Sequence, residues 1–512
     1  MGIKKGSSRS QLRMLSLEEA VKSDDMARVI DLFVEALDMD SFGFDDKGKS
    51  KVGSLAFSNK VMLKIYLLGY RNKVRSTREL EKACRYDLRF WWIANTLKPK
   101  YRVIADFRKN NKSSFKKVFT SFTKFLQSNG LISGAVVAID GTKIKASNSR
   151  MHNYSEKKLT KQLNSINKQI EDYLKQLDEA DSVESKQEKE DKLKELKSRK
   201  AVKEQLQNQL KASDESQIST VDPDARLMQT KLTHTDIVYN VQATTDSDNS
   251  LLVDFDVTNQ TDRYALSDCA KSAKEILGLE KMIALADAGY YTGSELKKCK
   301  KELIETFVSP VKRRGKNDSD YWVDKFKYDP EKDLYFCPEN EELKTDGKWH
   351  TQNKNQKGKS PYKMQIYKVS FTICKNCPVR EKCLSKSSIK NRMGRKIERS
   401  EYETIKEANN KRIAENKELY RTRKQIVEHP FGTIKRSWGM HYTNMRTKGK
   451  VEADIALAFL TYNLVRATNI LDIEVMISKL KNCRISFRLF EKLIDRLFKR
   501  YLNKQFETSY VI

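Results

Sequence analysis

Two aspartates in the sequence share one context. "GAVVAID" carries an apolar run into Asp140, "KMIALAD" carries another into Asp287, and a glycine follows each aspartate within two residues. In an open α/β sheet, functional groups gather beyond the ends of the strands, so neighbouring strands would place both carboxylates in one crevice. Close carboxylates repel each other, and such a pair requires a proton or a cation. Mg²⁺ (or Mn²⁺), which takes carboxylate, water and phosphate oxygens, is the cation that this pattern favours.

A third acid lies in "VEHPFGTIK", where Glu428 is surrounded by basic residues. Lys424 precedes it by four residues and Lys435 follows it by seven, so one helix would place all three on the same side. The pattern fits a metal ligand flanked by phosphate contacts, and it equally fits an ion-paired surface helix. Pro430 disfavours helical backbone at His429, so we expect a kink just after the acid.

Three converging carboxylates would support phosphoryl transfer with two metal ions. The ions lie about 3.5–4 Å apart and stabilise the attacking and leaving oxygens of an in-line displacement. Composition points to the same substrate class: 99 Lys and Arg against 69 Asp and Glu give a net charge of +30. A field of that sign attracts polyanions, above all DNA or RNA. Lys143 and Lys145, which follow Asp140, are candidates to hold the nucleic acid.

The sequence contains no apolar stretch long enough to span a bilayer, and its first residues lack the apolar core of a signal peptide. We therefore expect a cytosolic protein whose eight cysteines are reduced.

Three of these cysteines are closely spaced, Cys374, Cys377 and Cys383 in "TICKNCPVREKC", and a more distant Cys337 in "YFCPENEEL" could supply a fourth ligand. In a reducing compartment this spacing favours a structural Zn²⁺ site, and the alternative is a set of buried thiols.

Both helices and strands are predicted to position these residues. Residues 1–130 have the apolar periodicity of helices, and Ser76 with Glu79 predicts a capping box. Residues 131–311 predict the order β-β-β-α-β-α-β. Within them, leucines spaced by three and four over 153–219 predict an antiparallel coiled-coil hairpin, either a strut or a contact for DNA or a second subunit.

The rest of the chain divides into three further parts. Residues 312–400 form a polar, mostly β insertion that contains the cysteine cluster. Residues 401–475 are helical and include Glu428, and residues 476–512 form a basic helical tail.

Several phrases together resemble one family. "AIDGTKIKASNS", "ADAGYYTGSEL" and "VEHPFGTIKRSWG" are similar, in this order, to the three acidic motifs of the DDE transposases of bacterial insertion sequences. "TVDPDARLM" and "YNVQATTD" match further phrases of the branch with a tyrosine-arginine-glutamate-lysine signature. The resemblance covers nearly the whole chain, and it implies an α/β fold with a ribonuclease-H-like mixed sheet flanked by helices.

The resemblance also implies roles for single residues. Asp140, Asp287 and Glu428 map onto the catalytic, metal-binding triad. Lys435 has the expected spacing from Glu428, whereas Lys424 stands in the arginine's place and Tyr420 lies one residue further out than the signature predicts. The candidate DNA-binding residues are Lys143, Lys145, Tyr420, Arg423, Lys424, Lys435 and Arg436.

The family cleaves double-stranded DNA at transposon ends, usually with Mg²⁺, and joins the freed 3′ ends to target DNA. The resemblance therefore implies binding to terminal inverted repeats and target DNA, a homodimer on DNA, and a place at the bacterial nucleoid. We expect end recognition by the N-terminal helices, although a purely structural bundle is the alternative. Two other functions stay open: a catalytically silent or domesticated DNA-binding protein, and a stand-alone DDE nuclease.

Overall fold

A computed structural model of the chain describes residues 10, 14, 16–44, 56–178, 183–213, 215–231, 233–311, 321–353 and 360–486. The start of the predicted insertion (312–320) and the predicted tail from 487 onward lie outside the described residues. The chain forms two compact units, one of residues 1–282 with 422–512 and one of residues 283–421. None of the described helices is long and apolar enough to cross a membrane.

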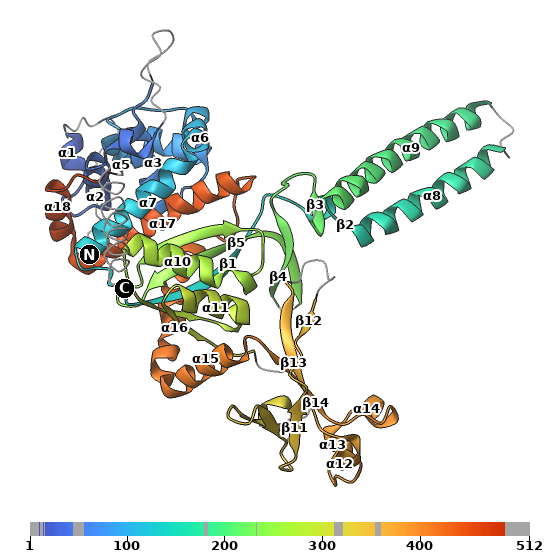
Figure 1. Ribbon diagram of the computed structural model, residues 1–512. Helices are drawn as coiled ribbons and strands as arrows, with labels where there is room; N and C mark the ends of the chain where they lie inside the picture. The colour runs from blue at the N-terminus through green and yellow to red at the C-terminus, as the bar shows by residue number, and fades with distance from the viewer. Residues whose placement is uncertain are drawn as a thin grey trace, which may run out of the picture. The chain divides into compact units, whose positions relative to one another are not determined.

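The first unit begins with a set of helices (Figure 1). They are α1 (Leu17–Ala20), α2 (Met26–Glu35), η1 (Met39–Phe42), α3 (Asn59–Arg71), α4 (Thr77–Tyr86), α5 (Leu88–Ile93), α6 (Tyr101–Asn110) and α7 (Lys112–Ser128). Helix α3 is buried from Val61 to Tyr70, because α2, α5 and the C-terminal helix α17 (Lys448–Leu471) surround it. Aromatic contacts such as Phe33 against Phe122 fill the space between the helices.

Ser76 is the N-cap residue of α4, as predicted, but the capping box predicted there is wrong. The Ser76 side chain makes no capping hydrogen bond. The capping box forms instead at Ser16, whose hydroxyl accepts from the backbone of Glu19 at 3.2 Å while the Glu19 carboxylate accepts from the Ser16 backbone at 3.1 Å. The serine-x-x-glutamate pattern occurs at both places, so the pattern alone does not decide which cap forms.

Four antiparallel strands form the sheet of the first unit: β4 (Arg226–Lys231), β5 (His234–Asp246), β1 (Val136–Lys145) and β6 (Leu252–Thr258). Strand β5 lies between β4 and β1, and β6 also pairs with β5. We expected β1 to end at Asp140, and this is wrong: Asp140 lies opposite Ala243 and the ladder continues to Lys145 opposite Val238. The strand continues because β5 is long enough to pair with the polar residues that follow the aspartate.

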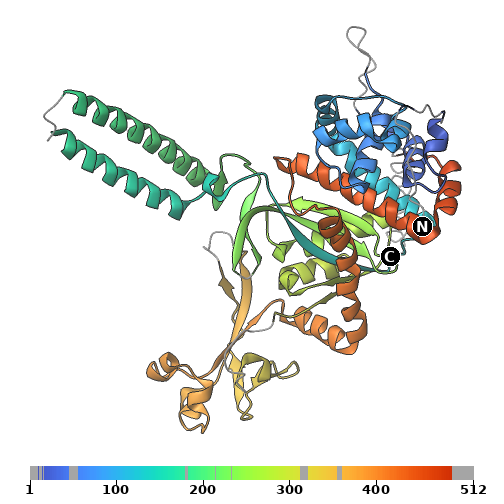
Figure 2. The same ribbon diagram turned by 180° about the vertical axis from the view of Figure 1, so that it is seen from behind.

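Helices cover both faces of this sheet (Figure 2). Neighbouring residues of a strand point to opposite faces. On β6, Asp254 accepts a hydrogen bond from Ser272 of α10 (Leu266–Leu277), whereas the Phe255 ring packs on Phe459 of α17. Asn463 of α17 accepts a hydrogen bond from the Leu252 N–H at 2.8 Å and donates one to the Leu252 carbonyl at 2.7 Å. These bonds satisfy the backbone of β6 on the edge where no second strand of the described residues pairs with it.

The predicted coiled-coil hairpin is confirmed. Helices α8 (Glu156–Asp178) and α9 (Val183–Ala212) run side by side (Figures 1 and 2), and the short strands β2 (Asn153–Ser155) and β3 (Gln217–Ser219) pair at its base. Six of the apolar residues that suggested the hairpin are buried, namely Leu159, Leu163, Ile166, Leu193, Leu196 and Leu210, whereas Leu174 is exposed.

The second unit contains two layers of structure. Strands β7 (Met282–Ala286) and β8 (Ile304–Val308) are neighbours in a sheet, with α11 (Gly293–Lys301) between them in sequence. Asn409 of α15 (Glu403–Glu415) bonds both backbone groups of Val308, at 3.0 and 2.8 Å. Outside residues 153–219, the predicted order of strands and helices is found with one additional strand, β4, which the sequence analysis missed. The α/β fold is consistent with a ribonuclease-H-like core.

The insertion in the second unit is a separate small sheet with three short helices. Its strands run in the order β12-β13-β11-β10-β9, with β14 paired to β13. The elements are η6 (Val323–Lys325), β9 (Lys327–Asp329), β10 (Leu334–Phe336), β11 (Glu342–Thr345), β12 (His350–Gln352), β13 (Tyr362–Lys368), α12 (Phe371–Lys375), α13 (Arg380–Cys383), α14 (Lys386–Lys390) and β14 (Lys396–Ser400).

Three further helical elements follow in the described residues. Helix α16 (Lys417–Phe431) passes from the second unit into the first. It continues directly into the π-helix η7 (Gly432–Ser437), and α18 (Ile473–Lys481) follows α17. The described part of the chain thus ends in helices that pack with the N-terminal ones.

Candidate active site

Strand β1 carries Asp140 out of a fully buried run. Val137, Ala138 and Ile139 have no solvent exposure, and Asp140 is half-buried. Its Oδ1 accepts a hydrogen bond from the Gly141 backbone at 2.9 Å. Because strand residues alternate between faces, Asp140 and Thr142 point to one face of the sheet and Gly141 to the other.

A polar cluster that sequence reasoning missed lies behind Gly141. Asp262, in the turn η4 (Asp262–Tyr264), accepts hydrogen bonds from Asn240 and Gln242 of β5, both at 2.7 Å. A Cβ at position 141 would come within 2.7 Å of Gln242 Nε2 and closer still to Asp262 Oδ1. Glycine at 141 therefore admits a buried polar group directly behind the strand that carries Asp140. The signal in the sequence was the run of polar residues in "NVQ" and "TNQTDR".

Lys435 is the basic residue that the structure brings to the face of Asp140. Its Nζ donates to Thr142 Oγ1 at 2.9 Å and to the Lys143 carbonyl at 3.1 Å. Burial lowers the pKa of Lys435 and the nearby Lys143 lowers it further, whereas the charge of Asp140 raises the pKa. The segment that follows Glu428 is thereby fastened to β1 beside the first aspartate.

Glu428 lies on α16 with its side chain 64% exposed. Its carboxylate is 3.6 Å from Lys424 Nζ, which is also exposed, so the predicted i,i+4 pair is present. Such exposed pairs contribute little free energy and separate easily. Arg423 lies on the same helix and is half-buried, and Arg436 is exposed on η7.

The expected kink at Pro430 takes another form. Helix α16 runs through Pro430 to Phe431, and the backbone then changes to a π-helix at Gly432. Proline removes a backbone donor, and a π-helical turn is one way to accommodate the lost bond. The change of helix type comes between Glu428 and Lys435, so the two residues are not on one regular α-helical stripe.

In the second unit, Asp287 follows β7 directly, as predicted. Its Oδ1 accepts from the Gly289 backbone at 2.8 Å and caps the short turn η5 (Ala288–Tyr290). Tyr420 of α16 donates its hydroxyl to the Ala286 carbonyl at 3.2 Å. The tyrosine thus contacts the backbone of the residue that precedes the aspartate.

The two lysines after Asp140 already have acidic neighbours. Lys143 Nζ lies 3.7 Å from Asp262, and Lys145 Nζ lies 3.1 Å from Asp236. Lys145 remains half exposed. In the described part of the chain, no three His, Cys, Asp or Glu side chains are already gathered as a metal shell. The donor set Asp140, Asp287 and Glu428 consists of hard carboxylate oxygens, which suit Mg²⁺.

Comparison with protein families decides the identity. Residues 336–468, which include Glu428 and Lys435, match the model of a transposase DDE domain. Residues 15–110 match the model of a second transposase domain. Together these matches indicate a DDE-type insertion-sequence transposase. Asp140 and Asp287 lie outside both matched segments. No curated protein and no solved structure matches the chain.

A buried charge network links the two matched segments of the transposase. Asp454 of α17, 2% exposed, pairs with Arg108 of α6 at 3.0 Å and with Arg75 at 3.7 Å. Arg75 also donates to the Gly439 and Tyr442 carbonyls, at 3.0 and 2.7 Å. The same loop bonds the end of β1, because Lys145 N donates to the His441 carbonyl at 3.0 Å. The N-terminal helices are thus tied to the strand of Asp140.

The phrase "TVDPDARLM" has a structural role that sequence reasoning did not assign. Asp222 is fully buried, and its Oδ1 accepts from the Tyr239 hydroxyl at 2.7 Å and from the Thr447 backbone at 3.1 Å. Asp224 accepts from the Lys448 backbone at 2.7 Å. The two aspartates therefore fix the loop that leads into α17, at the helix end that prefers negative charge.

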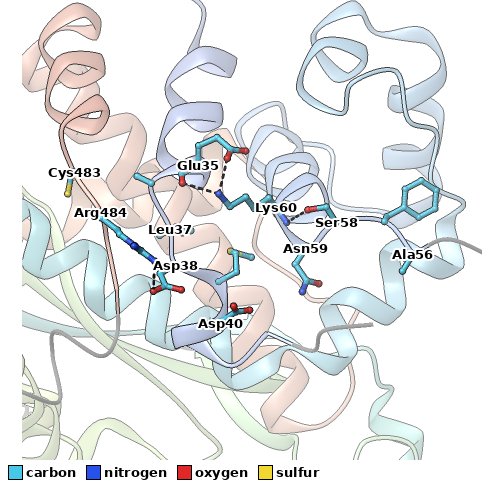
Figure 3. Close-up of a pocket in the computed structure, with 13 residues that line it drawn as sticks. Glu35, Leu37, Asp38, Asp40, Ala56, Ser58, Asn59, Lys60, Cys483 and Arg484 are labelled. Carbon is cyan, nitrogen blue, oxygen red and sulfur yellow. Dashed lines mark hydrogen bonds and ion pairs between the residues drawn. The ribbon is translucent and has the colours of Figure 1, made fainter. Parts of the chain in front are cut away.

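The first unit also contains a pocket of about 690 Å³ that is separate from the predicted site residues (Figure 3). It is lined by residues of three segments, with Lys60 reaching Glu35 at 2.8 Å and Arg484 reaching Asp38 at 3.2 Å. None of the predicted site residues lines it. Its walls include Ala56 and Arg484, close in sequence to segments outside the described residues, so its open volume supports no function.

Proposed function

We propose that this transposase binds the ends of its insertion sequence, cleaves the DNA there and transfers the 3′ ends to target DNA. The proposed catalytic residues are Asp140, Asp287 and Glu428, each of which would bind divalent metal. The observation that carries the proposal is the docking of Lys435, seven residues after Glu428, on the Thr142 side of β1. This contact brings the segment with the glutamate to the strand with the first aspartate.

The proposed cofactor is Mg²⁺ or Mn²⁺, bound as two ions by the three carboxylates. Bound ions would stabilise the charge on the attacking and leaving oxygens. The residues of the chain have their own tasks. Lys435 places a positive charge near Asp140 on β1, and Tyr420 holds the backbone before Asp287. Among the described residues, Glu428 pairs with Lys424 alone, a weak surface partner that leaves its carboxylate available to a metal ion.

The proposed DNA contacts follow the exposed basic groups near these acids. Lys145, Lys424 and Arg436 are exposed and suited to phosphate. Lys435 and Tyr420 would act mainly by holding the site, since each is engaged with the protein backbone. We propose end recognition by the helices of residues 15–110, and a homodimer on DNA at the bacterial nucleoid.

The direct test is cleavage and strand transfer in vitro with duplexes that carry the element's terminal repeats. D140N, D287N and E428Q should each abolish cleavage in Mg²⁺, by at least about a thousandfold, because each loses a charged metal ligand. They should still bind the end duplex in a mobility-shift assay. E418Q is the matched control, since Glu418 lies on the same helix, is 86% exposed and also has one basic partner.

The outcomes separate the functions. Cleavage at wild-type rate by any of the three acid variants would refute the assignment of that residue. End binding without cleavage by the wild-type chain would identify a silent or domesticated DNA-binding protein. Cleavage without joining would identify a stand-alone nuclease.

A further inference from the structure

The cysteine insertion has a second candidate site, remote in sequence from the three acids. Cys337 follows β10, Cys374 is in α12, Cys377 follows that helix, and Cys383 ends α13. All four line one cavity of about 30 Å³. One water or ion needs roughly 10–15 Å³ by this measure, so the cavity has room for a single ion and little more. We propose that these four cysteines bind one structural zinc ion.

The backbone around two of the sulfurs is arranged to support negative charge. The Glu341 N–H donates to Cys337 Sγ at 3.2 Å, and the Arg395 N–H donates to Cys374 Sγ at 3.5 Å. Zinc binds the thiolate form of cysteine, and backbone donors stabilise that form. A thiol packed as an ordinary apolar residue does not require such donors.

Each of the two cysteine segments also closes into a tight turn. In the first, Cys337 N donates to the Glu341 carbonyl at 2.9 Å and Asn340 N donates back to the Cys337 carbonyl at 2.8 Å. In the second, Cys377 N donates to the Cys374 carbonyl at 3.4 Å, and Arg380 N donates to the Cys377 carbonyl at 3.2 Å. Both turns carry cysteines whose residues line the same cavity.

Two arginines supply the balancing charge. Four thiolates around Zn²⁺ leave a net charge of about −2. Arg380 and Arg395 line the same cavity. Arg395 is fixed by bonds to the Cys383 carbonyl at 3.1 Å and to the Tyr321 carbonyl at 3.2 Å. The Nε–H groups of both arginines are buried without a hydrogen-bond partner in the described structure, and thiolate sulfurs are acceptors that would satisfy them.

The sulfurs surround the cavity without forming a closed shell, since no three ligand side chains of the described residues are already gathered around one point. Zinc binding would draw them inward. All eight cysteines are free thiols, and Cys84, Cys269 and Cys299 are buried outside this group.

The ion would have a mechanical task. The sheet of the insertion has a small core made of six residues: Phe326, Tyr335, Leu343, Tyr367, Val369 and Ile397. Cys337, Cys374 and Cys383 pack against this core. Bonds from zinc to Cys337 on the sheet side and to Cys374, Cys377 and Cys383 on the helical side would fasten α12 and α13 to the sheet.

Zinc content of the full-length protein tests this inference. Elemental analysis by plasma mass spectrometry should find about one zinc ion per chain, and the C374S/C377S double variant should lose most of it. C483S is the control and should keep its zinc, because Cys483 lies outside the cluster. D140N should also keep it, so failure of the proposed catalysis would leave this result unchanged.

A second measurement covers variants that do not fold. A mercurial that binds thiols should release zinc from the wild-type chain into a coloured indicator, in proportion to the cysteines that it blocks. Wild-type protein that contains no zinc, even after refolding with zinc chloride, would overturn the inference. A disulfide among the four cysteines, or full zinc content in C374S/C377S, would overturn it as well.

Discussion

The ladder that carries Asp140 and the sheet of the cysteine insertion differ in how they are stabilised. Strands β1 and β5 stay in register from Val137 to Lys145, and helices cover both faces of their sheet. In the insertion, strands β9, β10 and β12 have three residues each, and the core consists of six side chains. A large core can tolerate polar groups such as Asp262 behind the strand that carries Asp140. A small core needs cross-links of another kind.

The largest contrast should come from removing zinc. A strong chelator should leave the ladder region folded while the insertion opens, because the ion would supply much of the insertion's stability. Limited proteolysis should then cut within residues 321–400 at least about tenfold faster, with no new cuts within residues 130–150. The sites are mapped by mass spectrometry. Equal protection of the insertion with and without chelator would show that its small core suffices.

The next effect concerns the buried charges of the first unit. D454A should destabilise the protein by about 3–5 kcal/mol, because it leaves Arg108 and Arg75 buried without their carboxylate. Urea unfolding of the full-length chain measures this loss. E415A removes an exposed partner of Lys411 and should cost less than about 0.5 kcal/mol. A loss below about 1 kcal/mol in D454A would mean that water reaches the network.

A smaller loss of stability is expected at Gly141 of β1, behind which the polar cluster of Asn240, Gln242 and Asp262 lies. G141A places a Cβ against Gln242 and Asp262, and overpacking of this kind costs about 1–3 kcal/mol. Cleavage should fall too, since β1 must shift beside Asp140. G449A is the matched control, because its Cβ would meet only Lys112 Cδ at an ordinary 3.7 Å. Full activity and stability of G141A would show that the cluster moves aside freely.

The smallest effect is on pH dependence. His429 Nδ1 lies 2.6 Å from the Tyr462 hydroxyl, which donates to the Ser250 carbonyl at 2.8 Å, so the imidazole is the donor in the first bond. Burial and then Arg466 lower the pKa of His429. Stability should therefore fall as pH drops below about 6.5, where the unfolded chain takes up a proton that the folded chain resists. H429Q should show a flatter profile in urea unfolding between pH 7.5 and 5.5, and identical profiles would exclude this residue as the cause.

The strands and the coiled-coil hairpin could be predicted because their apolar residues repeat with the period of the element. The extension of β1 past Asp140 could not, because "GTKIK" is polar and only the register with β5 shows that it is paired. The same limit explains the capping box, which forms at Ser16 and not at Ser76. A local sequence pattern shows which hydrogen bonds are possible, and the packing of the folded chain decides which of them form.

The candidate site shows a similar division. Asp140, Asp287 and Glu428 stood out because single acids follow apolar runs or lie among lysines. Asp262 and Asp222 did not stand out, because their partners are distant in sequence and become neighbours only in the folded chain. Residues that touch substrate often leave a local mark in the sequence, whereas residues that hold them in place often leave none.

Helix α17 has a consequence for how such an element can evolve. The helix is buried almost without interruption from Ala453 to Leu464, and it packs on α3, α7 and strand β6 alike. A truncation that removes residues 1–125 would bare this apolar surface and favour aggregation. The N-terminal helices therefore cannot be exchanged as a unit between different insertion sequences. We propose that these helices recognise the DNA ends, and a change of end preference would then arise by substitutions on their outer surface while the contacts with α17 stay unchanged.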